Sequence, residues 1–186
     1  LSLHDALPIL VRGNMSEDKY VELARKTIEA YIRGREVIDV PEDLPEEMLN
    51  TMAGAFVSLH RNGNLRGCIG TISATRDSVA EEIISNAISA STRDPRFEPL
   101  REGELEDLEI SVDVLGDAEQ IDSMEELDVK RYGVIVTKGW KRGLLLPDLD
   151  GVDTPAQQVK IALMKAGLSP DETGYTLERF EVIRHI

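Results

Sequence analysis

The stretch AGAFVSLHRNGNLRGCIGTI, residues 53–72, constrains the fold more than any other part of the sequence. Two runs rich in apolar and β-branched residues flank the turn residues Asn62 and Gly63. An Asn-Gly pair between two such runs is a strong signal for a β-hairpin. The chain is therefore expected to contain at least one antiparallel strand pair.

The length of the hairpin loop decides which side chains share a face, because side chains alternate along a strand. A two-residue loop would place Val57 and Leu59 on the same face as Cys68. A three-residue loop, closed by a residue in the left-handed conformation, separates the apolar from the polar side chains, and we expect this loop. One face then carries Ala55, Val57, Leu59, Leu65 and Ile69, and the other carries Phe56, Ser58, His60, Arg66 and Cys68.

The rest of the chain alternates between helical and extended patterns. Helices are expected within residues 15–36, 75–94 and 154–170, where apolar residues recur at helical spacing. A strand is expected within 105–115, a second hairpin within 132–149 and a closing strand within 175–183. Because the helices fall between hairpins, the fold class is α+β with antiparallel or mixed sheet and flanking helices, rather than a doubly wound parallel fold.

The charge and the rare residues exclude several functions. Acidic residues number 35 against 21 Lys and Arg, which gives a formal net charge of −14. Binding to nucleic acid or to anionic membrane needs the opposite charge, so neither is expected. The single cysteine fits a reducing compartment. The sequence has neither a phosphate-binding glycine loop nor the ligands of a zinc or iron–sulfur site, so no cofactor or metal is expected.

The first residues require separate treatment. LSLHDALPI, residues 1–9, reads as the translation of a common sequencing-adaptor oligonucleotide. We expect residues 1–14 to be an assembly scar with its lead-in, and residues 15–186 to be the domain, starting at Met15. An upstream domain, replaced by the adaptor, remains an alternative.

Several motifs together carry a family resemblance. LRGCIGT at 65–71 lies within the longer pattern FV.L...G.LRGCIG at 56–70, and DPRF at 94–97, GLLLP at 143–147 and KAGL at 165–168 follow it. With these motifs the chain resembles the AMMECR domain family over about residues 18–184. The resemblance implies an α+β fold with a larger lobe of sheet and helices and a smaller, tightly packed lobe. It also implies a cytoplasmic protein.

The resemblance also bears on function. Family members of this kind are called AmmeMemoRadiSam system protein A, after their association with a MEMO-like protein and a radical S-adenosylmethionine protein. An accessory or binding subunit of such a system is therefore expected, without an assigned reaction of its own. The chain departs from the family at residues 148–154, DLDGVDT, where relatives often carry Gln and, further on, an aromatic residue.

Cys68 is the central candidate residue. Its neighbour Arg66, on the same expected face, would favour the thiolate, and His60 is placed to act as a base. The grouping is compatible with a binding surface, with a nucleophile or metal ligand, and with simple packing. We favour the binding surface. Its expected members are Ser58, His60, Arg66, Gly67, Gly70, Asp94 and Arg96.

The DPRF motif allows two interpretations. Asp94 and Arg96 either stabilise a turn by pairing with each other, or Arg96 points into a pocket as a forked donor. If Arg66 and Arg96 converge, the pocket is locally basic, and a peptide carboxylate or a small anionic ligand is the expected guest. The alternative function is a thiol-dependent enzyme in which Cys68 attacks, Arg66 activates it, and Asp94 or His60 transfers the proton.

A second candidate surface lies at the tip of the second hairpin. Trp140 is the only tryptophan, and the basic residues Lys141 and Arg142 follow it. Aromatic residues with basic neighbours are common at protein interfaces, so this tip is a candidate partner surface. The alternative is that the Trp140 ring folds back onto the sheet.

Overall fold

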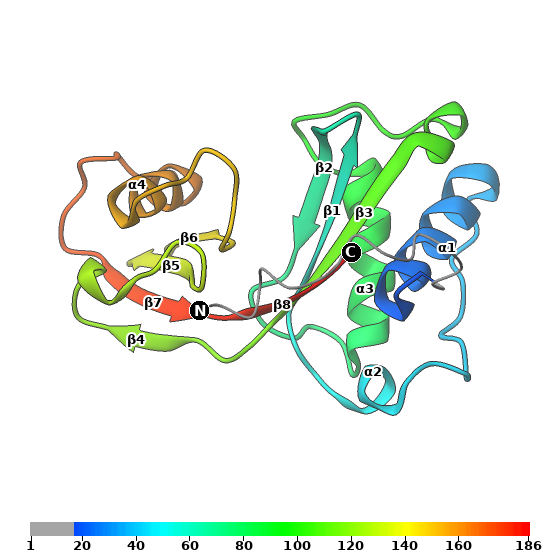
Figure 1. The fold of residues 1–186 in the computed structure, drawn as a ribbon, viewed down its shortest axis with the longest axis horizontal. Helices are drawn as coiled ribbons and strands as arrows, with labels where there is room; N and C mark the ends of the chain where they lie inside the picture. The colour runs from blue at the N-terminus through cyan, green and yellow to red at the C-terminus, as the bar shows by residue number, and fades with distance from the viewer. Residues whose placement is uncertain (1–16) are drawn as a thin grey trace, which may run out of the picture.

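The computed structural model describes residues 17–186 as two lobes (Figure 1). The large lobe comprises residues 17–115 and 182–186, and the small lobe comprises residues 119–180. Residues 1–14, which the sequence assigns to an adaptor and its lead-in, lie outside the described residues. Within the described part of the chain, no helix has the length and apolar character to cross a lipid bilayer.

The large lobe is an antiparallel sheet with helices on one face. The strand order is β2-β1-β3-β8, and every neighbouring pair is antiparallel. The helices α1 and α3 pack on each other and cover the sheet face that carries Val57, Leu59 and Val112. The elements of this lobe are α1 (Lys19–Gly34), α2 (Glu46–Asn50), β1 (Ala55–Arg61), β2 (Asn64–Gly70), α3 (Val79–Thr92), the short helix η1 (Glu102–Asp107), β3 (Leu108–Leu115) and β8 (Val182–His185).

The small lobe repeats this arrangement with a single covering helix. Its antiparallel sheet has the order β4-β7-β5-β6, and α4 packs against β5 and β6. Thr154 caps α4 in a reciprocal capping box with Gln157, and Pro155 takes the first helical position. The elements are β4 (Glu119–Ile121), the short helix η2 (Met124–Glu126), β5 (Gly133–Lys138), β6 (Lys141–Leu145), α4 (Pro155–Lys165) and β7 (Thr176–Phe180). The α+β fold with antiparallel sheets that the sequence predicts is confirmed.

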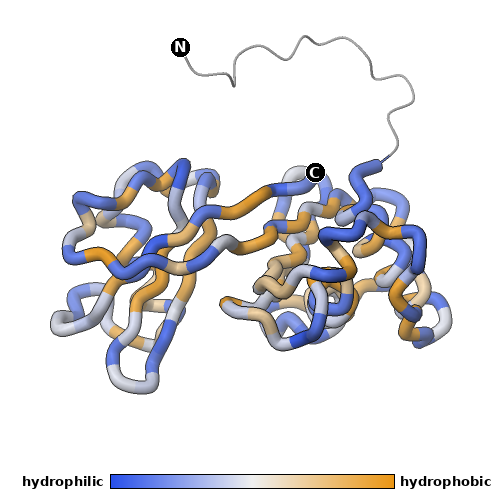
Figure 2. The backbone as a smooth tube through the Cα atoms, turned by 90° about the horizontal axis from the view of Figure 1, so that it is seen from below, coloured by the Kyte–Doolittle hydropathy of each residue, from blue (hydrophilic) through white to orange (hydrophobic). Residues whose placement is uncertain are grey.

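Two chain segments connect the lobes. β3 leads into β4 and β7 leads into β8, so the two segments run antiparallel beside each other from one lobe to the other (Figures 1 and 2). The backbone N–H of Gly116 donates to the carbonyl of Glu181 at 2.8 Å and holds them together. A separate apolar cluster fills the junction: Leu115, Ile135, Leu144, Leu146 and Phe180, with Phe56 packed against it.

The first hairpin differs from the expected form. Arg61 pairs with Asn64, so the loop has two residues, Asn62 and Gly63, both with positive φ. The prediction of a three-residue loop is therefore wrong. A β-bulge supplies the missing shift of register, because Leu59 pairs with Gly67 while His60 pairs with Leu65.

The bulge restores most of the expected faces. Ser58 pairs with Cys68, and Val57 pairs with Ile69, as the predicted separation of polar and apolar faces requires. Leu65 was expected on the apolar face with Val57, but it lies on the same face as His60. Arg66 is the extra residue of the bulge. The side chain of Arg66 is thereby displaced from the face that carries Cys68.

Candidate binding cleft

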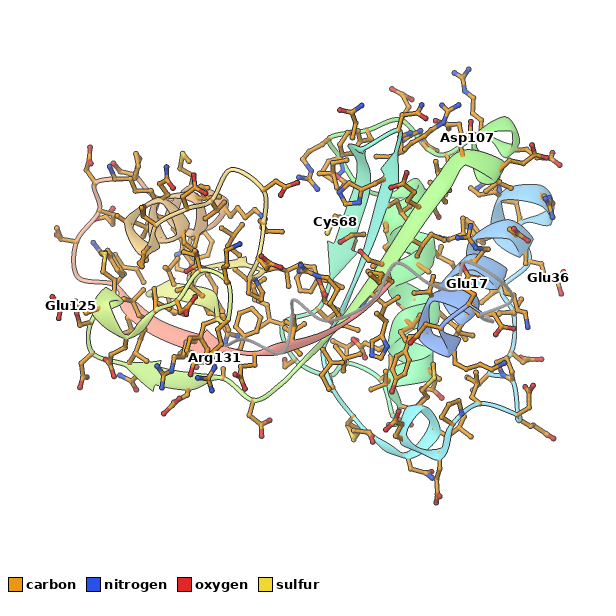
Figure 3. All side chains as sticks on the ribbon, in the orientation of Figure 1. Glu17, Glu36, Cys68, Asp107, Glu125 and Arg131 are labelled. Carbon is orange, nitrogen blue, oxygen red and sulfur yellow. The ribbon has the colours of Figure 1, made fainter. Side chains whose placement is uncertain are left out.

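The sheet face of the large lobe that the helices leave uncovered looks onto the small lobe. Between them lies a cleft with a volume of about 690 Å³. The large lobe contributes Phe56, Ser58 and Cys68 to its lining, and the small lobe contributes Leu144, Leu146 and Lys165. Figure 3 shows Cys68 on the side of the large lobe that faces the small lobe. The signature strand β2 is therefore a wall of this cleft.

The Cys68 thiol is partly buried in the cleft. Its Sγ lies 3.2 Å from Oγ of Ser58, which comes from the neighbouring strand β1. Burial raises the pKa of the thiol, and the hydrogen bond with Ser58 and the charges of Lys165 and Arg96 lower it only in part. Cys68 is therefore a neutral thiol at pH 7, which is the form expected of a binding group.

Asp94 and Arg96 join the DPRF turn to the signature strand. The buried Asp94 accepts a hydrogen bond from the backbone N–H of Cys68 at 2.9 Å. Arg96 donates to both carboxylate oxygens, with Nε 3.0 Å from Oδ1 and Nη2 2.8 Å from Oδ2. The hydrogen bond from Arg96 lowers the pKa of Asp94 to about 2. Arg96 also lines the cleft, so both interpretations of the motif describe part of its role.

Arg66 takes a different position from the expected one. Its Nε and Nη2 lie 2.9 and 3.1 Å from the two carboxylate oxygens of Glu104, and its Nη1 donates to the carbonyl of Glu98 at 2.8 Å. The bulge turns the side chain away from the cleft, which it does not line. Arg66 therefore does not converge with Arg96 in the cleft, and its expected position beside Cys68 is wrong.

Lys165 is the cleft residue that sequence reasoning missed. It is the last residue of α4, and it faces groups of the opposite lobe. Lys165 is an exposed residue, yet partial desolvation of its ammonium lowers its pKa. The charge of Arg96 acts in the same direction, and the charge of Asp94 acts in the opposite one. The available signal was its position at the start of KAGL, one of the motifs that carry the family resemblance.

A second missed pair closes the cleft near the junction of the lobes. Asp113 of β3 is 1% exposed, and Arg184 of β8 binds both of its carboxylate oxygens at 2.7 and 3.1 Å. Nη2 of Arg184 also donates to the carbonyl of Pro147 in the small lobe at 3.0 Å. The alternation of the sequence around β3 placed Asp113 on a polar face, and nothing local indicated that this face would be covered.

The two glycines of the signature serve packing rather than ligand approach. A Cβ on Gly67 would overlap the carbonyl oxygen of Ala90 in α3, and a Cβ on Gly70 would overlap the ring of Phe56. Ser58 and His60 do line the cleft, as expected. Within residues 17–186, no three His, Cys, Asp or Glu side chains come together to hold a metal ion.

The tip of the second hairpin is exposed. Trp140 follows Gly139 in a two-residue loop and is 89% exposed, so its ring does not fold back onto the sheet. Nζ of Lys141 lies 5.7 Å from the centre of the Trp140 ring, and it also donates to the carbonyl of Gly167 at 3.1 Å. Arg142 pairs with Glu178 at 3.4 Å.

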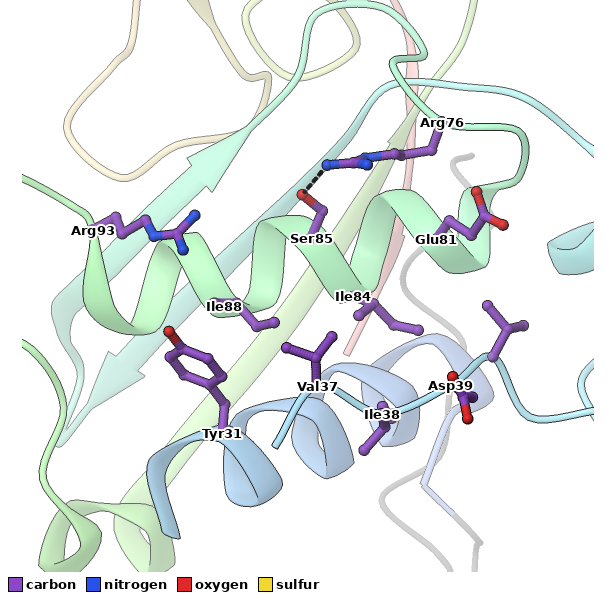
Figure 4. Close-up of a pocket in the computed structure, with 11 residues that line it drawn as sticks. Tyr31, Val37, Ile38, Asp39, Arg76, Glu81, Ile84, Ser85, Ile88 and Arg93 are labelled. Carbon is purple, nitrogen blue, oxygen red and sulfur yellow. Dashed lines mark hydrogen bonds between the residues drawn. The ribbon is translucent and has the colours of Figure 1, made fainter. Parts of the chain in front are cut away.

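Another cavity, of about 440 Å³, lies between α1, residues 37–40 and α3 (Figure 4). Val37, Ile84 and Ile88 form its apolar part, and Arg76 at one end donates to Ser85 at 3.4 Å. It contains no residue of the LRGCIG or DPRF motifs. The cleft between the lobes is therefore the stronger candidate site.

Comparison with known proteins agrees with the motifs. The AMMECR1 family model matches residues 21–185. A protein of Thermotoga maritima is 48% identical over 172 residues, which cover 92% of this chain and 99% of the relative. A protein of Clostridium acetobutylicum is 51% identical over 170 residues, which cover 91% of this chain but 36% of that longer protein.

A solved structure shows the same fold. The crystal structure of an uncharacterized protein from Pyrococcus horikoshii matches with a TM-score of 0.83 and 32% sequence identity, over 89% of this chain and 88% of that one. The resemblance to the AMMECR domain family is confirmed by the family model, the relatives and this structure together. The chain belongs to the AMMECR1 family.

Proposed function

We propose that this chain is a binding subunit whose cleft holds a peptide or small ligand, and that it acts with a MEMO-like protein and a radical S-adenosylmethionine protein. The observation that carries the proposal is the cleft of about 690 Å³, with the LRGCIG strand as one wall and Arg96 of DPRF at its side. Pockets of this size with an apolar floor and a few polar groups are typical of ligand sites.

The state of Cys68 supports binding over catalysis. A nucleophilic thiol needs a lowered pKa or an adjacent base. Burial instead raises the pKa of Cys68, and its hydrogen-bond partner is the Ser58 hydroxyl. Arg66, the expected activator, is bound to Glu104. The metal and radical chemistry is assigned to the partner proteins.

The exposed hairpin tip supports a docking role. Trp is enriched among the residues that dominate the binding energy of protein interfaces. Trp140 is 89% exposed, and Lys141 lies over its ring. We assign this surface, made of Trp140, Lys141 and Arg142, to the contact with the MEMO-like protein.

Co-purification of the full chain with the MEMO-like protein tests the docking surface. Trp140→Ala is expected to weaken the association at least tenfold, the range of a binding hot spot. Val37→Ala, at an exposed apolar residue of the large lobe, is the matched control and should leave the association unchanged. The absence of any association with the unmodified chain contradicts the proposed partnership.

Product formation in the reconstituted three-protein system tests the cleft. Cys68→Ser and Cys68→Ala are both expected to retain product formation, because a binding thiol is replaceable. Loss of all product with both variants, in chains that still fold and associate, would instead favour the alternative of Cys68 as a nucleophile. One observation favours that alternative: the charges of Lys165 and Arg96 both act to stabilise the thiolate.

A further inference from the structure

Three cations line the cleft, and two of them are already paired. Arg96 is held by Asp94, and Arg184 is held by the buried Asp113. Lys165 makes no ion pair or hydrogen bond with any residue between 17 and 186, although it lines the same cleft. Lys165 is therefore a cleft cation that has no anionic partner within the described residues.

Arg96 retains an unused donor on the same side. Its Nε and Nη2 are bound to Asp94, and Nη2 also reaches the carbonyl of Cys68 at 3.5 Å. Its Nη1 has no hydrogen-bond acceptor in the described chain, and the side chain is 51% exposed although its Asp94 partner is 2% exposed. An Arg guanidinium offers five N–H donors in a fixed plane, so a paired Arg can still donate to a second oxyanion.

Lys165 and Arg96 come from opposite lobes and act on the same place. Lys165 ends α4 of the small lobe, whereas Arg96 follows α3 of the large lobe. Each is close enough to Cys68 for its charge to act on the thiol, and each is close enough to act on the other. Both cations therefore line the same cleft, and each would attract an anion that binds there.

We infer that Lys165 and Arg96 form an oxyanion subsite that takes the carboxylate or phosphate group of a ligand with an apolar body. The inference rests on the proposed binding function and names the chemistry of the ligand. Phe56, Leu144 and Leu146 supply the apolar surface for the body, and the Cys68–Ser58 pair lies beside them. Charge-assisted hydrogen bonds to both lobes would hold the anion.

Acidic residues elsewhere in the cleft limit the positive charge to the region around Lys165 and Arg96. Asp148 and Asp150, on the loop after β6, also line the cleft, and Asp148 lies 3.5 Å from Lys130. The cleft as a whole therefore carries both signs of charge and does not attract every anion. Discrimination comes from placing the anion at Lys165 and the apolar body on the leucines.

Competitive acylation of lysines in the full chain tests the inference. An amine-reactive reagent is applied with N-acetyl-leucine, with its neutral analogue N-acetyl-leucinamide, or with inorganic phosphate, and each lysine is followed by mass spectrometry. N-acetyl-leucine is expected to slow the acylation of Lys165 several-fold. The amide at the same concentration is not expected to slow it. Lys160, exposed on the same helix, is the internal control and should react equally in every arm.

The arms also separate the two sources of the oxyanion. Protection by N-acetyl-leucine indicates a carboxylate ligand, and protection by inorganic phosphate alone indicates a phosphate ligand. Failure of both to protect Lys165 overturns the inference. Equal protection by the amide also overturns it, because the apolar body then binds without the cations.

A variant series gives an independent measurement. Lys165→Met keeps an unbranched side chain of similar size without the charge. It is expected to raise the Kd of the protective oxyanion about tenfold or more, the effect of losing one charge-assisted hydrogen bond. Lys160→Met is the matched control, with an unchanged Kd expected. An unchanged Kd in Lys165→Met overturns the subsite. Co-purification with the MEMO-like protein is measured on the same variants, so failure of the partnership is distinguished from failure of the subsite.

Discussion

The carboxylate of Asp94 accepts a hydrogen bond from the backbone N–H of Cys68 at 2.9 Å. The turn after α3 is thereby bonded to the outer edge of β2, the last strand of its sheet. An exposed strand edge invites pairing with other chains, and covering it is a common solution. Through this contact DPRF covers the edge of LRGCIG and places Arg96 at the cleft.

Replacing Asp94 tests the energetic weight of this contact. Asp94→Asn is expected to lower the free energy of unfolding at pH 7 by about 2 kcal/mol, since its pKa falls from its ordinary value of about 4 to about 2 on folding. A lowered carboxylate pKa stabilises the fold above the unfolded-state value, and this stability is lost as pH falls toward 2. Urea unfolding at several pH values measures the difference between the two proteins.

The control for this experiment is Asp171→Asn. Asp171 is exposed and takes part in no ion pair of the described chain. Its substitution should change the unfolding free energy by less than about 0.5 kcal/mol. A gap between Asp94→Asn and the unmodified chain that stays constant from pH 7 down to pH 2.5 contradicts the assigned role of the charge.

Gly67 is expected to tolerate no side chain. In Gly67→Ala the new Cβ meets the backbone carbonyl of Ala90 in α3, which cannot move without shifting the helix. Overpacking of this kind costs about 1–3 kcal/mol, and a thermal or urea melt measures the loss. Gly103→Ala is the control, because no atom lies within 4 Å of the added Cβ. Equal stability of the two variants rules out the close approach of β2 to α3.

Cys68 should react slowly with alkylating reagents at neutral pH. Burial raises its pKa, and the thiolate fraction falls about tenfold for each unit by which a pKa rises. Iodoacetamide labelling, followed by mass spectrometry, is expected to be slower than labelling of free cysteine. In Ser58→Ala the labelling should slow further, because the hydrogen bond that favours the thiolate is lost. Labelling at pH 7 that is faster than that of free cysteine supports the nucleophile instead.

Arg66 should contribute to stability and not to ligand binding. Its paired contacts with Glu104 are partly buried, with 18% and 16% of the two side chains exposed. A double-mutant cycle with Arg66→Met and Glu104→Gln is expected to give a coupling of about 1 kcal/mol. Because Arg66 does not line the cleft, oxyanion protection of Lys165 should persist in Arg66→Met. Loss of that protection in a folded Arg66→Met protein would show that Arg66 takes part in ligand binding.

Local patterns predicted the elements of the fold well. Asn62-Gly63 marked the turn of the first hairpin, and the helix expected within residues 154–170 is α4, Pro155–Lys165. The period-two alternation placed Ser58 and Cys68 on one face, and they pair directly. These features depend on the φ preferences and side-chain alternation of adjacent residues, so they can be predicted from short stretches of the sequence.

The loop length was wrong, and with it the expected faces of Leu65 and Arg66. Clean faces were expected from a three-residue loop, yet a two-residue loop followed by a bulge at Arg66 produces nearly the same parity. Relative to a plain two-residue hairpin, both arrangements add one residue between the paired parts of the strands. The alternation of apolar residues shows that a residue is added, but not whether it lies in the loop or in the strand. Packing against η1 and the turn after α3 decides it, because Glu104 and the carbonyl of Glu98 hold the Arg66 side chain there.

The composition of the cleft depends on contacts across the chain. Lys165 lines the same cleft as Cys68 and Arg96 only because the two segments β3–β4 and β7–β8 place the small lobe against the uncovered face of the large lobe's sheet. Turns, strands, the helix cap and the family motifs follow from neighbouring residues and are visible in the sequence. Which charges remain unpaired depends on groups about 70 to 100 residues apart, and their distances exist only in the folded chain.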